Sequence, residues 1–503
     1  MEKKIHRNAL LSVTDKSQLA SLSRGLIAHG FILWASGGTR AFLTEKGIEV
    51  RGVEDLTGFP SILGGRVKTL HPFVLGGVLG DPEIEGHPQD LEQHKIRLFD
   101  VVVVNFYDFS TRSRNGEEEG IEAIDIGGPT IVRAAAKNFR RVLVLTDPTD
   151  YPEALDHLGS GSTPFRRKMA QKAFSLTTSY DASILSWIGS PKEKEEPFPS
   201  LLPLAKEPKA LRYGENPHQN GAVYRMGNGA LADGTQHQGK PLSYNNYLDM
   251  DGALRALSVL PSAGAVVVKH ANPTGMAVED DPALAFTKAW GGDPRAAFGS
   301  VVALSNLTKE AALEISKVFV EVVLSLHCDD DALDILSSKK NLRVFSLPSL
   351  TKPPWSIRSV GGVALWQEAD PGPTHPDEWS WEGDPPNEEL ISDLVLANGA
   401  ALVMRSNAIS LVKEGVLVGA GAGLTSRVGA LEVALRIAGE RSKGAVMGSD
   451  AFFPFRDGID LAADHGVIGV VQPGGSIRDD EVSKAASEHG LPIAFTGRRH
   501  FNH

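Results

Sequence analysis

Four consecutive valines, Val101 to Val104, constrain the fold more than any other feature of this chain. A strand that is apolar at every residue has both faces covered, which is typical of a parallel sheet packed between helices. Around this run, short apolar segments alternate with helical patterns, and such alternation predicts parallel βαβ units. We expect strands at 9–13, 31–35, 101–105 and 142–146, and helices at 18–29, 130–138 and about 164–187.

The chain has 503 residues, which is too long for a single hydrophobic core. Residues 190–200 are charged and proline-rich without apolar periodicity, so we interpret them as a linker. The α/β pattern then resumes, and residues 366–388, rich in Pro, Asp, Glu and Trp, predict an irregular connector. We expect one domain at 1–198 and a second at 199–503.

Bulk properties exclude several classes of protein. No apolar run approaches the roughly 18 residues of a membrane span, and the first apolar segment is too short for a signal peptide. A formal net charge of −11 argues against nonspecific binding to nucleic acid or to a membrane surface. The single cysteine, Cys328, excludes an internal disulfide framework and a cysteine-rich zinc site. We therefore expect a cytoplasmic protein that requires no metal.

Two short motifs place a basic residue and an asparagine after an apolar run. One contains Lys269, His270 and Asn272, and the other contains Arg405 and Asn407. We interpret both apolar runs as strands, because a buried strand that ends in a polar turn delivers side chains to a ligand site. A lysine beside a histidine offers a donor and a proton acceptor. Their spacing of 136 residues suggests two related subdomains but is no proof of a duplication.

Glycine-rich turns in the first domain suit an anion. Ser36 and Thr39 flank two glycines between a predicted strand and a helix, although a plain helix cap is an alternative. Arg66, Lys68 and Thr69 follow another glycine pair and predict a grip on a phosphate or a carboxamide, against a solvated basic turn as the alternative.

A third turn also begins a helix. Asp125 precedes Gly127-Gly128-Pro129, which places Pro129 at the predicted first helical position. Arg133 and Lys137 then lie four residues apart on one helical face. Asn105 follows the valine strand, where a polar group faces a ligand crevice.

Polar and aromatic clusters also mark the second domain. Arg212 and Tyr213 lie in a turn-like segment, and Arg427 ends a Gly-Ala-Gly-Ala-Gly loop that suits an anion or only tight packing. Residues 449–457 place three phenylalanines beside two aspartates, which is compatible with a slot for a flat heterocycle or with a core cluster.

Taken together, these motifs resemble the bifunctional purine-biosynthesis family of AICAR transformylase/IMP cyclohydrolases, PurH. The resemblance runs in order from Ser12 to Phe501. It rests on Gly-Gly-Arg-Val-Lys-Thr-Leu-His-Pro, Arg-Tyr-Gly-Glu-Asn-Pro-His-Gln and Asp-Ala-Phe-Phe-Pro-Phe-Arg-Asp.

The resemblance implies a methylglyoxal-synthase-like N-terminal domain that closes formyl-AICAR to IMP. By resemblance, Asp125 and Lys137 carry protons, while Lys68 and Tyr107 stabilise an oxyanion. The residues that match ribotide-binding positions are Ser12, Lys16, Ser36, Thr39, Arg66 and Thr69.

For the second domain, the resemblance implies two cytidine-deaminase-like α/β subdomains without zinc. They transfer a formyl group from 10-formyltetrahydrofolate, a cosubstrate, to the 5-amino group of AICAR. By resemblance, His270 accepts the proton, Lys269 assists the leaving nitrogen or the oxyanion, and Asn407 stabilises the tetrahedral species. Arg212, Tyr213, Arg427 and Arg499 match ribotide-binding positions, and Phe452, Phe455 and Asp457 match the folate slot. The family also implies a homodimer.

Several residues depart from the family pattern. Arg405 replaces the usual lysine, and a planar guanidinium differs from a point ammonium. Leu424 and Thr425 replace a polar pair, and the smaller departures are Leu75, Gly80, Asp108 and Thr274. These changes motivate the alternative of a cyclohydrolase whose second half only mediates dimerisation. A noncatalytic ribotide-binding protein is a further alternative, whereas a nicotinamide dehydrogenase lacks its G-x-G-x-x-G signature.

Overall fold

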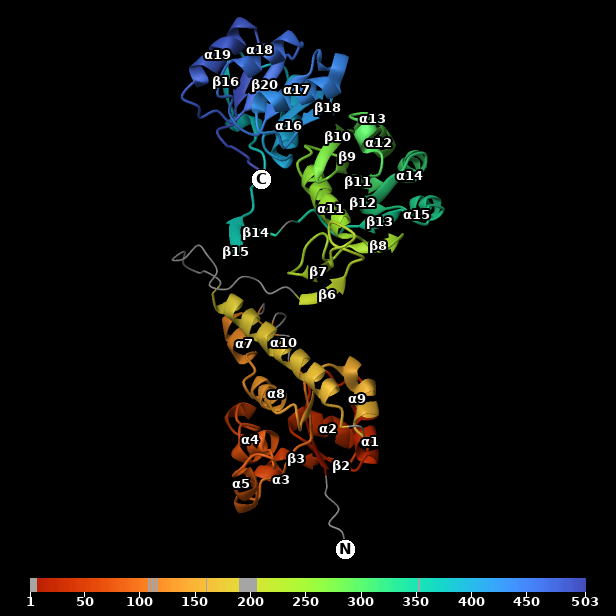
Figure 1. Cartoon of the computed structure of the whole chain (residues 1–503), viewed down its shortest axis with the longest axis vertical. Helices are drawn as coiled ribbons and strands as arrows, with labels where there is room; N and C mark the ends of the chain where they lie inside the picture. The colour runs from red at the N-terminus through yellow and green to blue at the C-terminus, as the bar shows by residue number, and fades with distance from the viewer. Residues whose placement is uncertain are drawn as a thin grey trace. The chain divides into compact units, whose positions relative to one another are not determined.

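The computed structural model describes residues 7–106, 109, 113, 116–159, 161–189, 206–351 and 353–503. The chain divides into two compact units, 1–204 and 205–503 (Figure 1). The predicted linker at 190–200 lies outside the described residues. Across the described ranges, no helix has the length and apolar character needed to cross a membrane.

The first unit is built on a five-stranded parallel sheet in the order β3-β2-β1-β4-β5. All four residues of β4 (Val101–Val104) are buried, which confirms the interpretation of the valine run. The strand order reverses between β1 (Arg7–Ser12) and β4, so right-handed crossovers place helices on both faces. In open α/β sheets, ligands bind at the carboxyl ends of the strands beside this reversal.

Helices of the first unit pack on the strands and on each other. The long helix α10 (Thr163–Ile188) contacts β5 and α8, and α8 (Gly127–Lys137) contacts β4 and β5. Because α8 begins at Gly127, Pro129 is its third residue and not its first. The remaining elements are α1 (Leu19–Ala28), β2 (Phe31–Ala35), α2 (Gly37–Glu45), β3 (Arg51–Gly52), α3 (Val53–Thr57), η1 (Leu63–Gly65), α4 (Pro72–Leu79), α5 (His87–Gln93), α7 (Glu117–Glu122), β5 (Leu143–Leu145), η3 (Pro148–Asp150) and α9 (Tyr151–His157).

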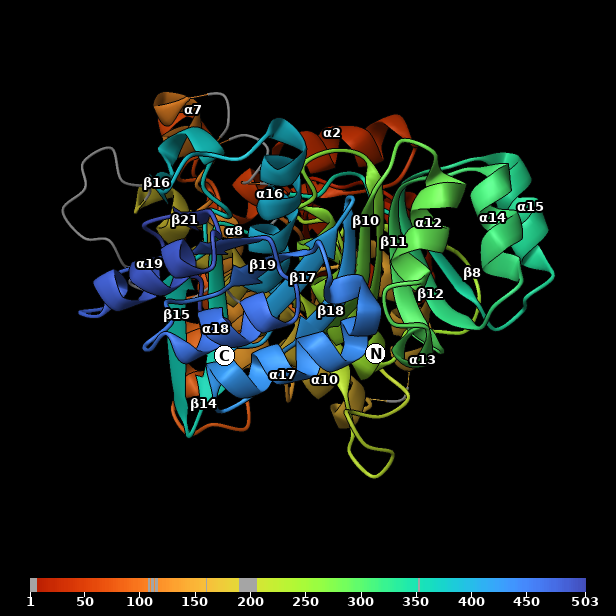
Figure 2. The same ribbon diagram turned by 90° about the horizontal axis from the view of Figure 1, so that it is seen from above.

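The second unit contains one continuous sheet of 12 strands, in the order β16-β21-β20-β19-β17-β18-β10-β9-β11-β12-β13-β8. Figure 2 shows this sheet with β19, β17, β18, β10, β11 and β12 in succession across the view. Its two halves meet where β10 (Asn272–Val278) pairs with β18 (Val416–Gly421) in antiparallel fashion.

Each half of this sheet repeats the same topology. In chain order, strands β8 to β13 of one half occupy the same positions as strands β16 to β21 of the other. Each half consists of an antiparallel edge strand (β8 or β16), three parallel strands (β11–β13 or β19–β21) and an antiparallel hairpin (β9–β10 or β17–β18). The helix before each hairpin is α11 (Tyr244–Leu257) in one half and α16 (Glu388–Val403) in the other. The topology therefore confirms the prediction of two related subdomains.

Two predictions for this region are wrong in detail. Residues 401–403 end the helix α16, so the apolar run before Arg405 is not a strand. Periodicity alone cannot separate four apolar residues of a strand from the same run in a buried helix. The predicted connector at 366–388 also contains the strand β16 (Ser380–Glu382), which pairs with β21 at the sheet edge.

The second unit is completed by helices that cover the sheet and by two small two-stranded sheets. Its remaining elements are β6 (Lys206–Ala210), β7 (Ala222–Arg225), β8 (Thr235–Gln238), β9 (Gly264–Lys269), α12 (Pro282–Trp290), α13 (Pro294–Ala297), β11 (Ser300–Leu307), α14 (Lys309–Ser316), β12 (Val320–Cys328), α15 (Asp330–Ser337), β13 (Arg343–Ser346), β14 (Trp355–Val360), β15 (Val363–Glu368), η4 (Pro376–Glu378), β17 (Ile409–Lys413), α17 (Arg427–Ala438), η5 (Gly439–Ser442), β19 (Val446–Ser449), α18 (Asp457–Asp464), β20 (Gly469–Gln472), α19 (Asp479–Glu488) and β21 (Ile493–Phe495).

Candidate active sites

A cavity of about 580 Å³ opens at the carboxyl ends of β1 and β4 in the first unit. This is the position that the reversal of strand order predicts. The cavity brings together eight residues from sequence positions far apart, all of them predicted site residues: Ser12, Lys16, Ser36, Thr39, Arg66, Lys68, Thr69 and Asp125.

The N-terminus of α2 forms one wall of this cavity. Ser36 is buried there, and its hydroxyl has no hydrogen-bond partner among the described residues. Gly37 has φ = +53°, and a Cβ at this position would lie 3.9 Å from Lys68 Nζ. The lysine ammonium therefore lies beside the positive end of the helix, and together they attract an anion.

The hydroxyl of Thr39 is already engaged by the main chain. It accepts the N–H of Val13 at 3.0 Å and donates to the Val13 carbonyl at 3.1 Å. Asn105 acts similarly, because its side-chain oxygen accepts the N–H groups of Thr14 at 2.7 Å and of Asp15 at 3.0 Å. These two residues line the cavity and hold the loop after β1 in place.

Asp125 lies at the N-terminus of α8, on the opposite wall. Its Oδ1 accepts the N–H of Gly128 at 3.0 Å, which is a favourable position for a carboxylate. A Cβ at Gly128 would lie 2.5 Å from Asp125 Oδ2, and a Cβ at Gly127 would lie 3.0 Å from Thr69 Oγ1. The glycine pair is therefore needed for close approach of the backbone to these two side chains.

Tyr180, on α10, is a residue of this site that sequence reasoning missed. Its hydroxyl accepts the N–H of Asp125 at 2.7 Å and donates to the Ala123 carbonyl at 3.0 Å. Burial raises the pKa of this phenol, so the hydroxyl keeps its proton. Tyr180 thus fixes the turn that carries Asp125 through hydrogen bonds to two of its main-chain groups. No short-range motif marks it, since it lies 55 residues further along the chain.

Of the residues predicted for this site, Lys137 lies away from the cavity and Tyr107 lies outside the described residues. Lys137 is the last residue of α8 and is exposed, at the opposite helix end from the cavity. Eleven residues of helix correspond to roughly 16 Å. Arg66 lines the cavity and forms an ion pair with Glu122, a partner that the sequence did not suggest.

In the second unit, Lys269 is the last residue of β9, and His270 follows it in the turn between β9 and β10. Lys269 Nζ donates to the Phe298 carbonyl at 2.8 Å, and His270 is exposed. His270 and Ala271 adopt φ values of +53° and +59°, which L-residues avoid. Asp249 on α11 accepts the N–H of Ala271 at 2.7 Å and so supports this unfavourable turn.

The other half of the sheet repeats this turn between β17 and β18. There, Glu414 and Gly415 have φ values of +52° and +71°, and Lys413 Nζ donates to the Lys443 carbonyl at 2.9 Å. Asp393 accepts the N–H groups of both turn residues, at 2.8 and 2.7 Å.

The two supporting aspartates are equivalent in position. Asp249 is the sixth residue of α11, and Asp393 is the sixth residue of α16. Burial raises the pKa of each carboxyl. The lysine and the supporting aspartate therefore belong to the repeated fold, whereas the histidine is specific to the first half.

Asn272 joins the two motifs that the sequence singled out. Its side-chain oxygen accepts the N–H of Arg405 at 2.9 Å, and its side-chain nitrogen donates to the His270 carbonyl at 3.1 Å. The N–H and the side-chain amide of Asn407 both donate to the Leu424 carbonyl, at 3.1 and 2.9 Å. Leu424 thus supports Asn407 through its main chain alone.

Arg427, a predicted ribotide ligand, has much of its hydrogen-bonding capacity used within the protein. It donates to Asp450 at 2.7 Å and to Ser449 at 2.9 Å, and its side chain is 10% exposed. Asp450 is fully buried and also accepts bonds from Ser406 Oγ and from the N–H of Ala408 at 3.2 Å. Asp450 therefore ties Arg427 to the loop that carries Asn407.

The other predicted residues of the second unit lie on its surface. The guanidinium of Arg212 lies 5.3 Å from the ring centroid of Tyr213, and that of Arg499 lies 4.2 Å from the ring of Phe501. Of the predicted folate-slot residues, Phe455 and Asp457 are exposed and Phe452 is half-buried. Phe453 between them is fully buried and belongs to the core.

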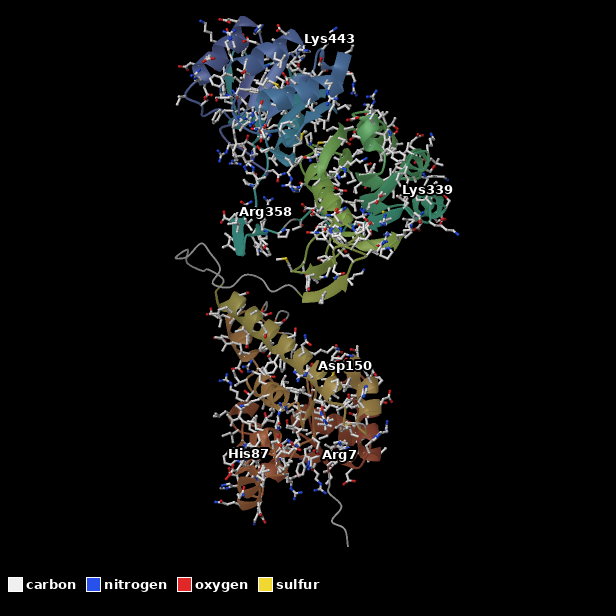
Figure 3. The ribbon with its side chains drawn as sticks, in the orientation of Figure 1. Arg7, His87, Asp150, Lys339, Arg358 and Lys443 are labelled. Atoms are coloured by element: carbon white, nitrogen blue, oxygen red, sulfur yellow. The ribbon has the colours of Figure 1, made fainter. Side chains whose placement is uncertain are left out.

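The substituted position, Arg405, belongs to a cluster of three arginines with Arg255 and Arg358. Arg405 and Arg358 both donate to the main-chain oxygen of His503, and Figure 3 labels Arg358 on the β14–β15 hairpin. Burial and the neighbouring charges of Arg255 and Arg358 lower the pKa of Arg405. Asp251 lies 3.2 Å from Arg255 and offsets part of this charge, so the cluster keeps a smaller excess of positive charge that suits an anionic ligand.

Comparisons with known proteins identify the class of enzyme first. Residues 135–437 match the family model described as "AICARFT/IMPCHase bienzyme", and residues 18–130 match the MGS-like domain. The chain belongs to the AICARFT/IMPCHase bienzyme family.

Curated relatives carry a more particular name. A protein of Desulfitobacterium hafniense is 43% identical over 99% of this chain and 100% of its own length. A protein of Magnetococcus marinus is 42% identical over 99% of both chains, and one of Halalkalibacterium halodurans is 41% identical over 99% of this chain and all of its own. Each is named "Bifunctional purine biosynthesis protein PurH".

Proposed function

We propose that this chain catalyses two consecutive steps of purine biosynthesis, formyl transfer to AICAR in the second unit and closure of formyl-AICAR to IMP in the first. The observation that carries the proposal is that each unit contains its own polar site, while full-length relatives bear a bifunctional name. Formyl-AICAR is the product of the first reaction and the substrate of the second.

The cavity of the first unit suits ring closure. The ribotide phosphate would bind at the N-terminus of α2, where main-chain N–H groups supply donors and Lys16 and Arg66 of the same cavity supply positive charge. The carboxamide nitrogen attacks the formyl carbon, one proton from this nitrogen and one from the formamide nitrogen pass to the formyl oxygen, and that oxygen leaves as water. Asp125, fixed by Gly128 and Tyr180, is placed to accept the nitrogen proton. Lys68 stabilises the developing oxyanion.

The roles of Tyr107 and Lys137 in this closure remain predictions. Lys137 does not line the cavity of the single chain. If it takes part in proton transfer, its substitution should lower the closure rate without weakening the binding of IMP.

A direct test of the first unit supplies formyl-AICAR and follows IMP. Lys68→Met should lower the rate of closure by at least tenfold, because it removes a charge from the substrate cavity. Lys46→Met is the matched control, since Lys46 is exposed at the end of α2 and does not line the cavity. Equal activity in the two variants would contradict the assignment.

The second unit suits formyl transfer. The 5-amino group of AICAR attacks the formyl carbon, His270 accepts the amine proton, and tetrahydrofolate leaves with a proton on its nitrogen. Lys269 has one hydrogen bond in the structure and further N–H donors for the oxyanion or the leaving nitrogen. Asn407 is held near this turn by the link through Asn272 and Arg405.

Two groups of residues would hold the substrates of formyl transfer. The exposed ring of Phe455 and the carboxylate of Asp457 suit the flat, hydrogen-bonding pterin of 10-formyltetrahydrofolate. Arg212, Tyr213 and Arg499 are available to the ribotide on the surface. We further propose a cytoplasmic homodimer, because surface sites of this kind become enclosed when a second copy covers them.

The alternative in which only the cyclohydrolase works is less well supported. Leu424 interacts with Asn407 through its carbonyl, which any residue supplies. Arg405 keeps the positive charge of the position it occupies. A test of the second unit follows tetrahydrofolate formation from AICAR and 10-formyltetrahydrofolate. His270→Ala should abolish it, whereas Glu414→Ala, at the repeated turn, should not.

A further inference from the structure

A second hollow lies in the first unit, at the opposite end of the sheet from the cavity. It has a volume of about 240 Å³ and is lined by residues at the amino ends of β1, β4 and β5. Because these strands are parallel, their amino ends and carboxyl ends lie at opposite edges. This hollow is therefore separate from the proposed cyclohydrolase site.

Four arginines define this hollow, and we refer to it as the arginine pocket: Arg7, Arg140, Arg141 and Arg166. One carboxylate, Asp100, also lines it. That carboxylate is shared, since its Oδ2 accepts the N–H of Asn8 at 3.1 Å and its Oδ1 lies 3.5 Å from Arg141 Nη1. Figure 3 labels Arg7, at the start of β1. The lining has a strong excess of positive charge.

Arg141 and Arg166 hold their guanidinium groups in place through the main chain. Arg141 Nη2 donates to the carbonyls of Gly77 at 3.0 Å and Val78 at 3.2 Å, and Arg166 Nη2 donates to the Gly161 carbonyl at 2.7 Å. These bonds fix the two side chains without neutralising them. A fixed guanidinium loses little conformational entropy on binding an oxyanion.

Some buried N–H groups of these arginines have no hydrogen-bond partner. Arg141 Nε and Arg166 Nε make no hydrogen bond to any of the described residues, and Arg141 Nη1 has only the ion pair with Asp100 at 3.5 Å. Burial lowers the pKa of Arg141, while the charges of Asp100 and Asp81 act in the opposite direction. Buried donors without acceptors are rare in native proteins because each one costs free energy. An anion in the hollow would balance the positive charge of four arginines that line it beside a single carboxylate.

The N-terminus of helix α10 adds to the positive potential in the arginine pocket. Its N-cap residue Ser162 and its residues Phe165 and Arg166 line the pocket, so the positive end of a 26-residue helix lies there. His157 also contributes to the wall and stacks on Phe165 with ring centroids 4.4 Å apart.

We propose that the arginine pocket binds a small, multiply charged oxyanion, such as inorganic phosphate or the phosphate group of a nucleotide. Arginine forks match the oxygens of phosphate, and four of them converge on a hollow of suitable size. The two sources share this chemistry, and the choice between them is an outcome of the test.

The experiment is calorimetric titration of the full chain at low salt with inorganic phosphate, pyrophosphate and ATP. The proposed cyclohydrolase cavity and the arginine cluster around Arg405 also suit phosphate, so Lys68→Gln and Arg405→Gln identify those two contributions. Arg166→Gln should weaken the remaining binding event by about tenfold, the effect of losing one charge-assisted hydrogen bond. Arg167→Gln is the matched control, because Arg167 neighbours Arg166 but lies over Phe139, 4.8 Å from its ring, outside the pocket.

Arg140→Gln provides a variant that should fold normally, since Arg140 is exposed and lines the pocket. It should weaken the same binding event. Tighter binding of ATP than of phosphate, with the same dependence on Arg166, supports a nucleotide as the source, and the reverse order supports free phosphate. If Arg166→Gln and Arg140→Gln both titrate like Arg167→Gln, the proposal is wrong.

Discussion

Replacement of Asp249 tests whether its hydrogen bond to the turn keeps His270 in the conformation that is needed for formyl transfer. The Asp249 carboxylate accepts the N–H of Ala271 at 2.7 Å, and both turn residues have positive φ. A hydrogen bond to a charged group contributes about 1.5–3 kcal/mol. A non-glycine residue in the left-handed region costs about 1–2 kcal/mol. Without the carboxylate, the turn should therefore relax toward another conformation.

We expect Asp249→Ala to lower kcat for formyl transfer by a factor of about ten to a hundred, which corresponds to the loss of that bond. The KM for AICAR should change much less, because Asp249 acts through the position of His270. Asp249→Asn should recover part of the activity, since an amide oxygen can still accept the N–H of Ala271.

The fold supplies a matched control for this substitution. Asp393→Ala removes two main-chain hydrogen bonds from the equivalent turn, so it should destabilise the protein at least as much. It should nevertheless leave formyl transfer within about twofold of wild type, because Glu414 replaces the histidine there. Closure of formyl-AICAR should be unchanged in both variants. Equal loss of formyl transfer in Asp249→Ala and Asp393→Ala would show that Asp249 has no specific effect on the position of His270.

Three further predictions concern single groups. Tyr180→Phe should slow closure of formyl-AICAR about tenfold without affecting formyl transfer, because the turn of Asp125 loses its clamp; unchanged closure would show that the clamp is not needed. Hydrogen bonds from Arg456 and then His489 lower the pKa of Asp460 from 3.8 to about 2, so its contribution to stability is complete above pH 3.8 and is lost as the pH falls toward 2. The difference in unfolding free energy between wild type and Asp460→Asn should shrink over that range in acid titrations followed by circular dichroism. Burial, with Asp329, raises the pKa of Cys328 to about 11, so iodoacetamide should alkylate it at pH 8 roughly a hundredfold more slowly than an ordinary thiol; alkylation at the ordinary rate would contradict this.

The sequence predicted the first unit well because its signals are local. Four valines identify a doubly covered strand, and glycine pairs mark helix starts where the backbone approaches a side chain. Ser36, which the pattern places directly after a strand, does line the cavity, and so does Ser12, which the family resemblance supplied. Tyr180 could not be found in this way, because its contact with Asp125 depends on how a distant helix packs.

The second unit shows the limit of short motifs. The prediction of two related subdomains was correct. It was based, however, on treating Lys269 and Arg405 as equivalent residues, which they are not. Lys269 ends a strand, whereas Arg405 follows a helix, and the true counterpart of Lys269 is Lys413. Only the order of strands in the sheet reveals this, because the amino-acid sequences of the two turns have just the lysine in common.

The central claim is that each unit carries a separate reaction, and complementation between two variants tests it most directly. His270→Ala and Lys68→Met proteins are purified separately, and each is supplied with AICAR and 10-formyltetrahydrofolate. Alone, the first should form no IMP because it makes no formyl-AICAR, and the second should form IMP at least tenfold more slowly than wild type because closure is impaired. Mixed, the two proteins should form IMP, because formyl-AICAR released by one is closed by the other. A mixture that forms tetrahydrofolate but no IMP would contradict the account.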